Sequence, residues 1–259
     1  SEIKKELSTV AKTEMKATAL FQQSGQSLGE TLKNLPGLNS IQTGPTLSKP
    51  VIHGMHSNRV LILNNGVRQE GQQWGDEHGL EIDAYGMQSI EVIKGPASLM
   101  YGSDAVAGVV SFIPQAADTS IKGIHGKITN EYQHNNNLIG NGLYFSQTIN
   151  KVTYQMSASH RLAKNYSNKA DDRVYNTGFK EINLTGKITY ELKKSRLSLN
   201  GTLYDNVQGI PDGSRDSISR RFTYQQYEGA LDQIKQRPLV SDQRLNSYAP
   251  ADLHQRIKH

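Results

Sequence analysis

Apolar and polar residues alternate along several stretches of the second part of the chain. In the longest, Ile182 to Leu192, every second side chain is apolar apart from Gly186, and the positions between are polar. A period of two residues is typical of a β-strand with one apolar and one polar face. The pattern predicts five strands, at 124–132, 143–149, 152–158, 182–192 and 197–203.

The connections between these segments differ in length in a regular way. Two are tight turns, at Asn150-Lys151 and Lys193-Lys194-Ser195, and three are long and polar, at Gln133–Gly140, Arg161–Gly178 and after Asn206. Soluble β-sandwiches also alternate, but have no reason to keep short turns at one end and long loops at the other. Transmembrane β-barrels do, with an apolar face toward lipid and a polar face toward the lumen. We therefore predict the first strands of such a barrel.

Two tyrosines bear on this prediction. Tyr154 and Tyr190 each lie a few residues from a short turn, on the apolar face of a predicted strand. Aromatic residues of transmembrane barrels gather at the membrane interfaces, which places both in a girdle. Ordinary β-propensity explains a strand tyrosine equally well, so neither residue alone decides.

The first part of the chain mixes short helix and strand signals. Ser27 followed by Glu30 is a capping-box pattern, three leucines follow on one helix face, and Pro36-Gly37 ends the helix. Short strands are predicted at Leu38–Gln42, Val51–His53, Arg59–Leu63, Ser89–Lys94 and Gly108–Ile113, with an irregular or strand-like stretch at Leu7–Met15 and a tight turn at Asn64-Asn65-Gly66.

The amino-acid composition excludes several kinds of site, and the charge differs between the two parts of the chain. The 259 residues include no cysteine, which excludes a disulfide framework and Cys-based metal sites, and no apolar run approaches the roughly 18 residues of a transmembrane helix. The overall charge is +5, but residues 1–115 carry a net −2 and residues 116–259 a net +7. We place a domain boundary in the segment 114–118.

One segment is much more specific than these patterns. Residues 89–110 run Ser-Ile-Glu-Val-Ile-Lys-Gly-Pro-Ala-Ser-Leu-Met-Tyr-Gly-Ser-Asp-Ala-Val-Ala-Gly-Val-Val. This segment resembles the plug-domain signature of TonB-dependent outer-membrane receptors. The Leu28–Gly37 helix, the Val51–Gly54 strand, the Arg59–Gly66 strand and turn, and Gln73–Gly79 match the same family in the same order. The resemblance covers residues 20–114 closely, and the barrel pattern supports it over 121–205.

The resemblance implies a fold and a function. The fold is an α+β plug domain at 1–115, followed at 116–259 by antiparallel β-strands of an incomplete transmembrane β-barrel. The implied function is active transport across the outer membrane of a Gram-negative bacterium, without catalysis and without a cofactor. The ligand is a scarce one: an iron-siderophore, haem, cobalamin or a metal complex. The implied partners are TonB, which acts on an N-terminal segment to displace or remodel the plug, this ligand, and outer-membrane lipid and lipopolysaccharide.

The same resemblance suggests which residues contact the ligand. The plug loops near Thr43–Lys49 and Arg68–Gly79 are expected to face it, with Gln73, Trp74, His78 and Arg68 as our choices. Trp74 is the only tryptophan and lies in a loop. Imidazole and carboxylate suit transition metals, so His53, His56 and His78 are weak metal candidates beside Asp76 and Glu77. A scaffold role for these histidines is the simpler interpretation.

Other plug residues are expected to serve packing against the barrel. Arg59, Glu91 and Lys94 are the predicted plug–barrel lock; the family usually has Arg where this chain has Lys94, and a lysine is a point charge rather than a bidentate fork. The signature turns contain Gly95, Pro96, Tyr101, Gly102 and Gly108, and glycines permit close backbone approach. Ordinary turn glycines would look the same.

The sequence favours other classes of function less. A soluble metalloenzyme would use His53, His56, Glu77 and His78, but no HExxH helix, nucleophile elbow or phosphate loop stands out. A β-rich adhesin or glycan-binding protein leaves the signature unexplained. The alternative to transport is a β-rich ligand- or metal-binding protein without transport activity. Nucleic-acid binding is not expected, because the basic residues follow strands and loops rather than a recognition helix. Basic loop residues would instead face lipopolysaccharide or an anionic ligand; they are Arg215, Arg220 and Arg221.

Both ends are expected to be truncated. No convincing TonB box appears in Ser1–Val10, which would precede the plug. Five strands leave open edges that lipid does not tolerate, and a plugged barrel of about 22 strands needs several hundred further residues. His259 falls where a sixth strand should begin.

Overall fold

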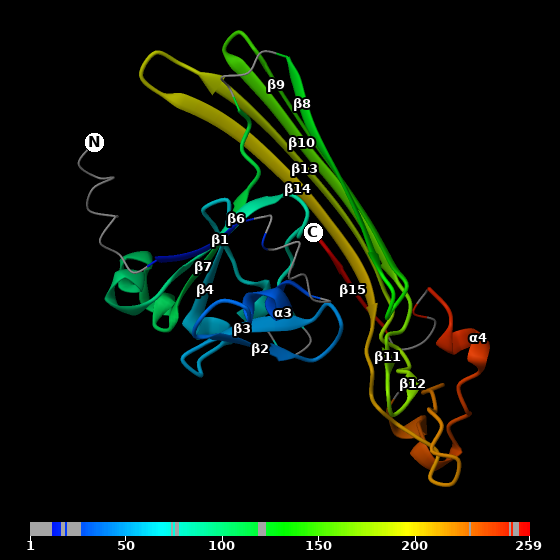
Figure 1. Cartoon of the computed structure of the whole chain (residues 1–259). Helices are drawn as coiled ribbons and strands as arrows, with labels where there is room; N and C mark the ends of the chain where they lie inside the picture. The colour runs from blue at the N-terminus through cyan, green and yellow to red at the C-terminus, as the bar shows by residue number, and fades with distance from the viewer. Residues whose placement is uncertain are drawn as a thin grey trace. The chain divides into compact units, whose positions relative to one another are not determined.

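The chain folds into two compact units that divide at residue 116. The computed structural model describes residues 12–16, 19, 27–73, 75, 78–118, 123–227, 229–248, 250 and 254–259. Figure 1 shows the first unit in blue to green and the second in green to red. Most of the expected Leu7–Met15 stretch and the whole of Ser1–Val10 lie outside the described residues. Within the described part, no helix is long and apolar enough to span a membrane.

The first unit is built on a five-stranded sheet. Its order is β1-β6-β7-β4-β5, in which β4 and β7 are parallel and the other neighbours antiparallel. Fully buried side chains of the central strands, such as Ile62, Val92 and Phe112, form the core with Leu32. The strands are β1 (Lys12–Lys16), β4 (Val60–Asn64), β5 (Val67–Gln69), β6 (Met87–Ile93) and β7 (Gly108–Pro114).

A short helix and a hairpin complete this unit. Helix α3 (Leu28–Leu32) begins after Ser27, whose hydroxyl accepts a hydrogen bond from the Glu30 amide at 3.3 Å. The reciprocal half of the predicted capping box is replaced, because the Glu30 carboxylate pairs with Lys33 one turn later. The hairpin strands are β2 (Leu38–Gln42) and β3 (Ser48–Ile52).

Two turns in this unit require backbone freedom. Asn65 and Gly66 join β4 to β5 with φ of 53° and 77°, the left-handed pair that the Asn-Asn-Gly sequence predicts. Gly108 opens β7 where a Cβ atom would lie 2.8 Å from the Ile93 carbonyl oxygen and 3.0 Å from Ile52 Cδ1. Only glycine fits that position without displacing buried neighbours. Short 3₁₀ turns link the strands; they are η2 (Ser57–Arg59), η3 (Gly71–Gln73), η4 (Gly95–Tyr101) and η5 (Ser103–Ala105).

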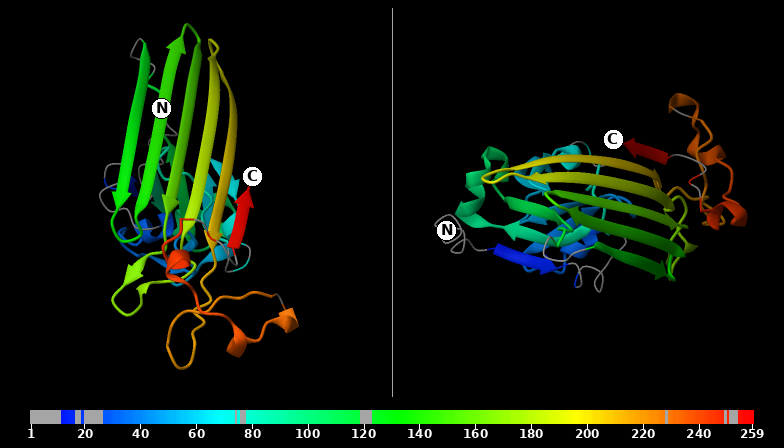
Figure 2. Two further views of the ribbon diagram at one scale, coloured as in Figure 1. Left: turned by 90° about the vertical axis from the view of Figure 1, so that its right-hand side faces the viewer. Right: turned by 90° about the horizontal axis from the view of Figure 1, so that it is seen from above.

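The second unit is a six-stranded antiparallel sheet that curves along its length (Figure 2). Each strand pairs with its neighbour in chain order, β15-β14-β13-β10-β9-β8. The five predicted strands are present and longer than the alternation indicated. The bounds are β8 (Ile124–Gln133), β9 (Leu138–Ile149), β10 (Val152–Ala163), β13 (Phe179–Glu191), β14 (Arg196–Gly209) and β15 (His254–Lys258).

Two predictions for this unit were wrong. The sixth strand begins at His254 rather than at His259. Its sequence shows no apolar period, and it pairs with the polar end of β14. The 133–140 segment is not a long loop: only residues 134–137 connect β8 to β9, with Asn137 at a φ of 48°. The Asn136 side chain stabilises this turn by accepting a hydrogen bond from the Leu138 amide at 3.2 Å.

The antiparallel register sorts the side chains onto two faces. Ser157, Thr185 and Thr202 lie opposite one another on a polar face. On the other face Ala158, Leu184 and Leu203 are aligned. Leu184 is 44% exposed there although its side chain is apolar. Tyr154 and Tyr190 are on this apolar face, both about two-fifths exposed, near the short turns at 150–151 and 192–195. An apolar face left exposed on one side of a sheet is the arrangement of a lipid-facing barrel wall.

The connections at the other end of the sheet are folded rather than extended. Residues 164–178 contain the small hairpin β11 (Ser167–Asn168) and β12 (Asp172–Arg173). Residues 210–253 contain η6 (Gly229–Leu231), η7 (Ile234–Gln236) and α4 (Asp242–Leu245). Val174, Tyr175, Phe222 and Val240 form a separate buried cluster between these two segments.

Candidate functional site

The two plug loops predicted to face a ligand contact each other. The buried Lys49 donates a hydrogen bond from Nζ to the Gly75 carbonyl at 2.7 Å. Gly79 packs so closely on the other loop that a Cβ atom there would lie 2.9 Å from the Ser48 amide nitrogen and 3.1 Å from Leu47 Cα. The segments 43–49 and 68–79 therefore lie against each other at Lys49 and Gly75 and at Ser48 and Gly79.

A buried glutamine anchors this surface to the sheet. Gln72 is 2% exposed, and its Nε2 donates to the Ser57 carbonyl at 2.9 Å and to the Val60 carbonyl at 3.1 Å. Gln73, the predicted ligand residue, follows at the end of η3 and is half-buried. Gln72 is therefore buried against the sheet, whereas the adjacent Gln73 is only partly buried.

Arg68 and His78 are positioned by carboxylates. Arg68 is exposed, pairs with Glu70 at 3.0 Å and also hydrogen-bonds Asp104 at the start of the second signature turn. His78 Nδ1 lies 3.7 Å from a carboxylate oxygen of Glu81. Trp74, Asp76 and Glu77 lie outside the described residues.

The histidines do not converge. His53 lies in an exposed turn with φ of 50°, and His56 Nδ1 lies 2.9 Å from the Ser57 hydroxyl. Among the residues that the structure places, no group of three or more His, Cys, Asp or Glu side chains is arranged to hold a metal ion.

The polar face of the second unit has its own buried network near the long connections. Glu181 is 4% exposed. One of its oxygens accepts from Asn183 at 2.9 Å, and the other from Asn206 at 3.2 Å and the Tyr204 hydroxyl at 3.4 Å. These donors from β13 and β14 give both oxygens of the buried carboxylate hydrogen-bond partners. The network lies at the end of the polar face where the long connections begin.

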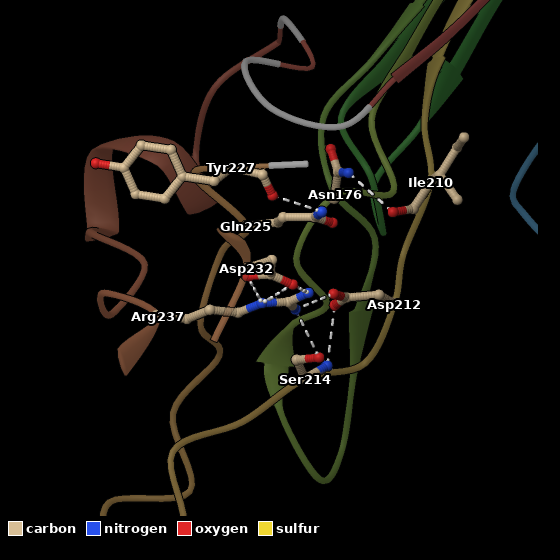
Figure 3. A network of polar contacts seen from close by, with 8 residues as sticks. All are labelled: Asn176, Ile210, Asp212, Ser214, Gln225, Tyr227, Asp232 and Arg237. Carbon is tan, nitrogen blue, oxygen red and sulfur yellow. Dashed lines mark hydrogen bonds and ion pairs between the residues drawn. The ribbon is translucent and has the colours of Figure 1, made fainter. Parts of the chain in front are cut away.

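An arginine organises the 210–248 segment, as Figure 3 shows. The side chain of Arg237 is 8% exposed, binds both carboxylate oxygens of Asp232 and donates to the Ser214 hydroxyl at 2.9 Å. It also pairs with Asp212. These bonds raise the pKa of Arg237 and lower that of Asp232, mainly through the hydrogen bonds between the two side chains. Arg237 therefore links the start of the segment, at Asp212 and Ser214, to its middle, at Asp232.

Two of the three loop arginines expected to meet an anion already have partners in the folded connections, at 164–178 and 210–248. Arg215 pairs with Asp171 at 2.8 Å, and its guanidinium lies 3.8 Å from the ring centroid of Phe222. Arg221 donates to the Val240 carbonyl at 3.2 Å. Arg220 is exposed and its side chain makes no hydrogen bond or ion pair within the described part of the chain. Contact of Arg220 with an anionic molecule stays a prediction.

Comparison with known proteins identifies the first unit. Residues 4–109 match the model of the TonB-dependent Receptor Plug Domain. The chain is 37% identical over 97 residues to the vitamin B12 transporter BtuB of Vibrio vulnificus, and 40% identical over 91 residues to an iron-regulated outer membrane virulence protein of Vibrio cholerae. Residues 4–109 are therefore a TonB-dependent receptor plug domain.

Solved structures extend the likeness into the second unit. The copper transporter OprC superposes on 77% of this chain with a TM-score of 0.67 and 20% identity. A ferric enterobactin receptor of Pseudomonas aeruginosa, PfeA, covers 91% with a TM-score of 0.65 and 16% identity. At these identities the likeness establishes the fold, a plug with part of an antiparallel barrel. The matches span 37% and 32% of this chain but only 16% and 14% of the two Vibrio proteins, and 31% and 37% of the two solved chains. Two of these proteins are named as transporters and one as a receptor, and none of the four is named as an enzyme.

In this plug domain, two of the three predicted lock residues have partners inside the plug unit. Glu91 on β6 pairs with Lys12 on β1, and the Lys94 ammonium hydrogen-bonds the Pro36 carbonyl just after α3. Arg59 is exposed, and its side chain makes no hydrogen bond or ion pair with the residues that the structure describes. A role of these three in contact with the barrel stays a prediction.

The signature glycines of the plug unit differ in what they do. Gly108 is required by close approach to Ile93 and Ile52 within the plug unit, and its predicted packing against the barrel stays a prediction. Gly95 and Gly102 have open space around them and instead adopt φ of 74° and 109°, which favour glycine on conformational grounds. Pro96 is the second residue of η4, and Tyr101, 42% exposed, ends it. Ser98 holds the turn together by donating to the Ala105 carbonyl at 2.6 Å.

Sequence reasoning missed three organising residues. Gln72 is adjacent to Gln73 and has no distinguishing local signal. Glu181 lies one residue before the predicted start of its strand. Arg237 lies in a polar segment without periodicity, so only the folded loop brings Asp212 and Asp232 to it.

Proposed function

We propose that the protein takes up a scarce ligand of the cobalamin or ferric-siderophore class across the outer membrane, with residues 1–115 gating the lumen of a barrel that begins at 116–259. The plug-domain match over residues 4–109 carries this proposal. The relatives support the ligand class, since one is named for vitamin B12, one for iron regulation and one for ferric enterobactin. Haem and metal complexes belong to the same range of scarce ligands.

The joined plug loops are the proposed contact surface. Gln73, Trp74, His78 and Arg68 would touch the ligand, and the Lys49–Gly75 bond would hold their loops in one arrangement. Fixing loops before binding lowers the entropy lost when a ligand binds. TonB is the proposed source of mechanical work, through the segment that precedes β1.

The test is uptake by cells. A strain without its own cobalamin and siderophore receptors is given the gene that encodes this chain, and accumulation of ⁵⁷Co-cyanocobalamin and ⁵⁵Fe-enterobactin is followed. Accumulation of either probe that stops when tonB is deleted supports the proposal. Both probes bound at the cell surface without accumulation would support the alternative, a ligand-binding protein without transport.

A further inference from the structure

Two long connections of the second unit pack against each other. Residues 164–178, which contain β11 and β12, are called the hairpin connection, and residues 210–248, which contain η6, η7 and α4, the helical connection. Tyr175 of the hairpin connection and Phe222 of the helical connection are both buried in one apolar cluster, with ring centroids 6.4 Å apart. Separating the two connections would expose these rings to water, which costs free energy.

A buried asparagine joins the two connections. Asn165 is 4% exposed, and its Nδ2 donates a hydrogen bond to the Leu245 carbonyl, at the end of α4, at 3.0 Å. Its Oδ1 accepts hydrogen bonds from the Thr177 amide at 2.7 Å and from the Gly178 amide at 2.9 Å. One side-chain amide therefore holds both ends of the hairpin connection together and ties them to the helical connection.

An ion pair forms a second link. Asp171 of the hairpin connection pairs with Arg215 of the helical connection at 2.8 Å. The two side chains are 18% and 27% exposed, so water and salt screen this pair less than a pair on the open surface. The Arg215 guanidinium also lies 3.8 Å from the ring centroid of Phe222, which connects the ion pair to the shared apolar cluster.

A third link lies where the helical connection leaves the sheet. The Asn176 side chain donates from Nδ2 to the Ile210 carbonyl at 2.9 Å, as Figure 3 shows. The two backbones are so close here that a Cβ atom at Gly209 would lie 2.4 Å from the Asn176 carbonyl oxygen. Two bodies that are joined at three separate points cannot rotate against each other without breaking at least one of the links.

We propose that the hairpin and helical connections form one rigid cap that moves as a single body, with Asn165 and Asp171 as the residues that join them. A molecule that displaces one connection displaces the other, and a partner at this end of the sheet meets a surface made by both. The proposal concerns contacts within the second unit and does not depend on which ligand is transported. Its failure is therefore separable from that of the uptake function.

The test measures distances between spin labels by pulsed electron paramagnetic resonance in the full receptor, purified in detergent. The 259 residues contain no cysteine, so labels are attached at introduced ones. Lys169→Cys and Ser217→Cys place one label on an exposed position of each connection. In the otherwise wild-type protein this pair is expected to give a single narrow distance distribution, because the two connections keep one arrangement.

The decisive variant exchanges the two joining residues, Asn165→Asp/Asp171→Asn, and so leaves composition and net charge unchanged. A carboxylate at 165 still accepts from the Thr177 and Gly178 amides but has no N–H to donate to the helical connection, and an amide at 171 cannot form the ion pair. The distance distribution between positions 169 and 217 should become about twofold wider, because the connections can then open separately.

The matched control makes the same kind of exchange in the same connection, Asn168→Asp/Asp172→Asn. Asn168 hydrogen-bonds Ala170 and Asp171 of its own hairpin, and Asp172 is exposed. The control should keep the narrow distribution of the wild type. Because it changes the hairpin without touching either link to the helical connection, it separates loss of the links from loss of the hairpin itself.

Two further measurements keep the proposal falsifiable if the exchange variant folds poorly. Labels at Lys151→Cys and Lys194→Cys, in the two short turns, should give the same distance distribution in every variant if the sheet is intact. The single variant Asp171→Asn removes only the ion pair and should widen the distribution between positions 169 and 217 to a smaller extent. A broad distribution in the wild-type background would overturn the proposal, and so would an unchanged one in both variants or equal widening in the control.

Discussion

Arg237 binds both carboxylate oxygens of Asp232, five residues earlier in the chain, with hydrogen bonds from Nε at 2.9 Å and from a terminal nitrogen at 2.5 Å. The same guanidinium reaches Ser214 and Asp212, so one side chain joins distant parts of the 210–248 segment. A loop at the outer end of the sheet is thereby held in one conformation, with its own buried cluster.

Replacing Arg237 by lysine should loosen this loop. Lysine carries the charge but cannot make the forked contact with Asp232. We expect backbone amides of residues 212–237 to exchange hydrogen about tenfold faster in the full receptor, because local opening becomes easier. Arg196→Lys is the control, since its pair with Glu191 is exposed and should leave exchange in β13 and β14 unchanged. Equal exchange in Arg237→Lys and wild type would show that the clamp is dispensable.

Acidification should loosen the same loop. Arg237 holds the pKa of Asp232 below its usual value, and hydrogen bonds from the Ser219 backbone and hydroxyl do the same for Asp216. A carboxyl with a lowered folded pKa stabilises the fold fully above its unfolded pKa of about 3.9, and this contribution is lost as the pH falls toward the folded value. The hydrogen-exchange rate of the loop amides, corrected for its intrinsic pH dependence, should be independent of pH near neutrality and increase below about pH 4. Asp216→Asn should flatten part of that rise; a profile identical to wild type would contradict the assignment.

Gly108→Ala should destabilise the plug more than an ordinary turn substitution. The new methyl would meet the Ile93 carbonyl and Ile52 at positions where real Cβ atoms are not found. We expect about 2–4 kcal/mol from the combined clash and backbone strain, measured by hydrogen exchange of β6 and β7 amides. Gly66→Ala has open space and a φ of 77°, so it should cost only about 1 kcal/mol. Similar values for the two variants would refute the close-approach argument.

Arg68 can be separated from its partner by a paired substitution. Arg68 and Asp104 are both exposed, so breaking their pair should cost about 0–1 kcal/mol of stability. If Arg68 contacts the ligand, Arg68→Ala should raise the uptake KM for whichever of ⁵⁵Fe-enterobactin or ⁵⁷Co-cyanocobalamin is transported, by about tenfold, as expected for a lost charged hydrogen bond. Asp104→Asn should leave KM near its wild-type value. Equal effects would mean that Arg68 serves only to hold the loop.

Arg220 and Arg215 should respond differently to neutralisation. Arg220→Gln removes an exposed charge and should slow association of the anionic ⁵⁵Fe-enterobactin, an effect that weakens as salt is added. Arg215→Gln breaks the pair with Asp171 and exposes Phe222, so it should increase hydrogen exchange in residues 166–175. Uptake kinetics at two salt concentrations together with exchange would show whether the two arginines have separate roles.

Local patterns determined much of the fold. Strict alternation at 182–192 predicts a two-faced strand whatever surrounds it, because successive side chains must point to opposite faces. Ser27 and the Asn-Asn-Gly turn act through backbone groups within a few residues, so the helix start and the turn between β4 and β5 were predictable. The predicted helix end at Pro36-Gly37 was wrong, because α3 already ends at Leu32 with Lys33 as its C-cap. The resemblance at residues 89–110 identified the family for the same reason: its information lies in contiguous residues.

Only the tertiary structure decided which charged and polar side chains meet. Glu91 pairs with Lys12 through the β1–β6 register, Lys94 meets the carbonyl of Pro36, and Lys49 reaches Gly75, each across a large separation in sequence. The sixth strand was hidden because His254–Lys258 has no apolar period and is held by pairing with β14. Such contacts depend on register and loop closure, which no local pattern encodes, because the residues that meet come from different strands and loops.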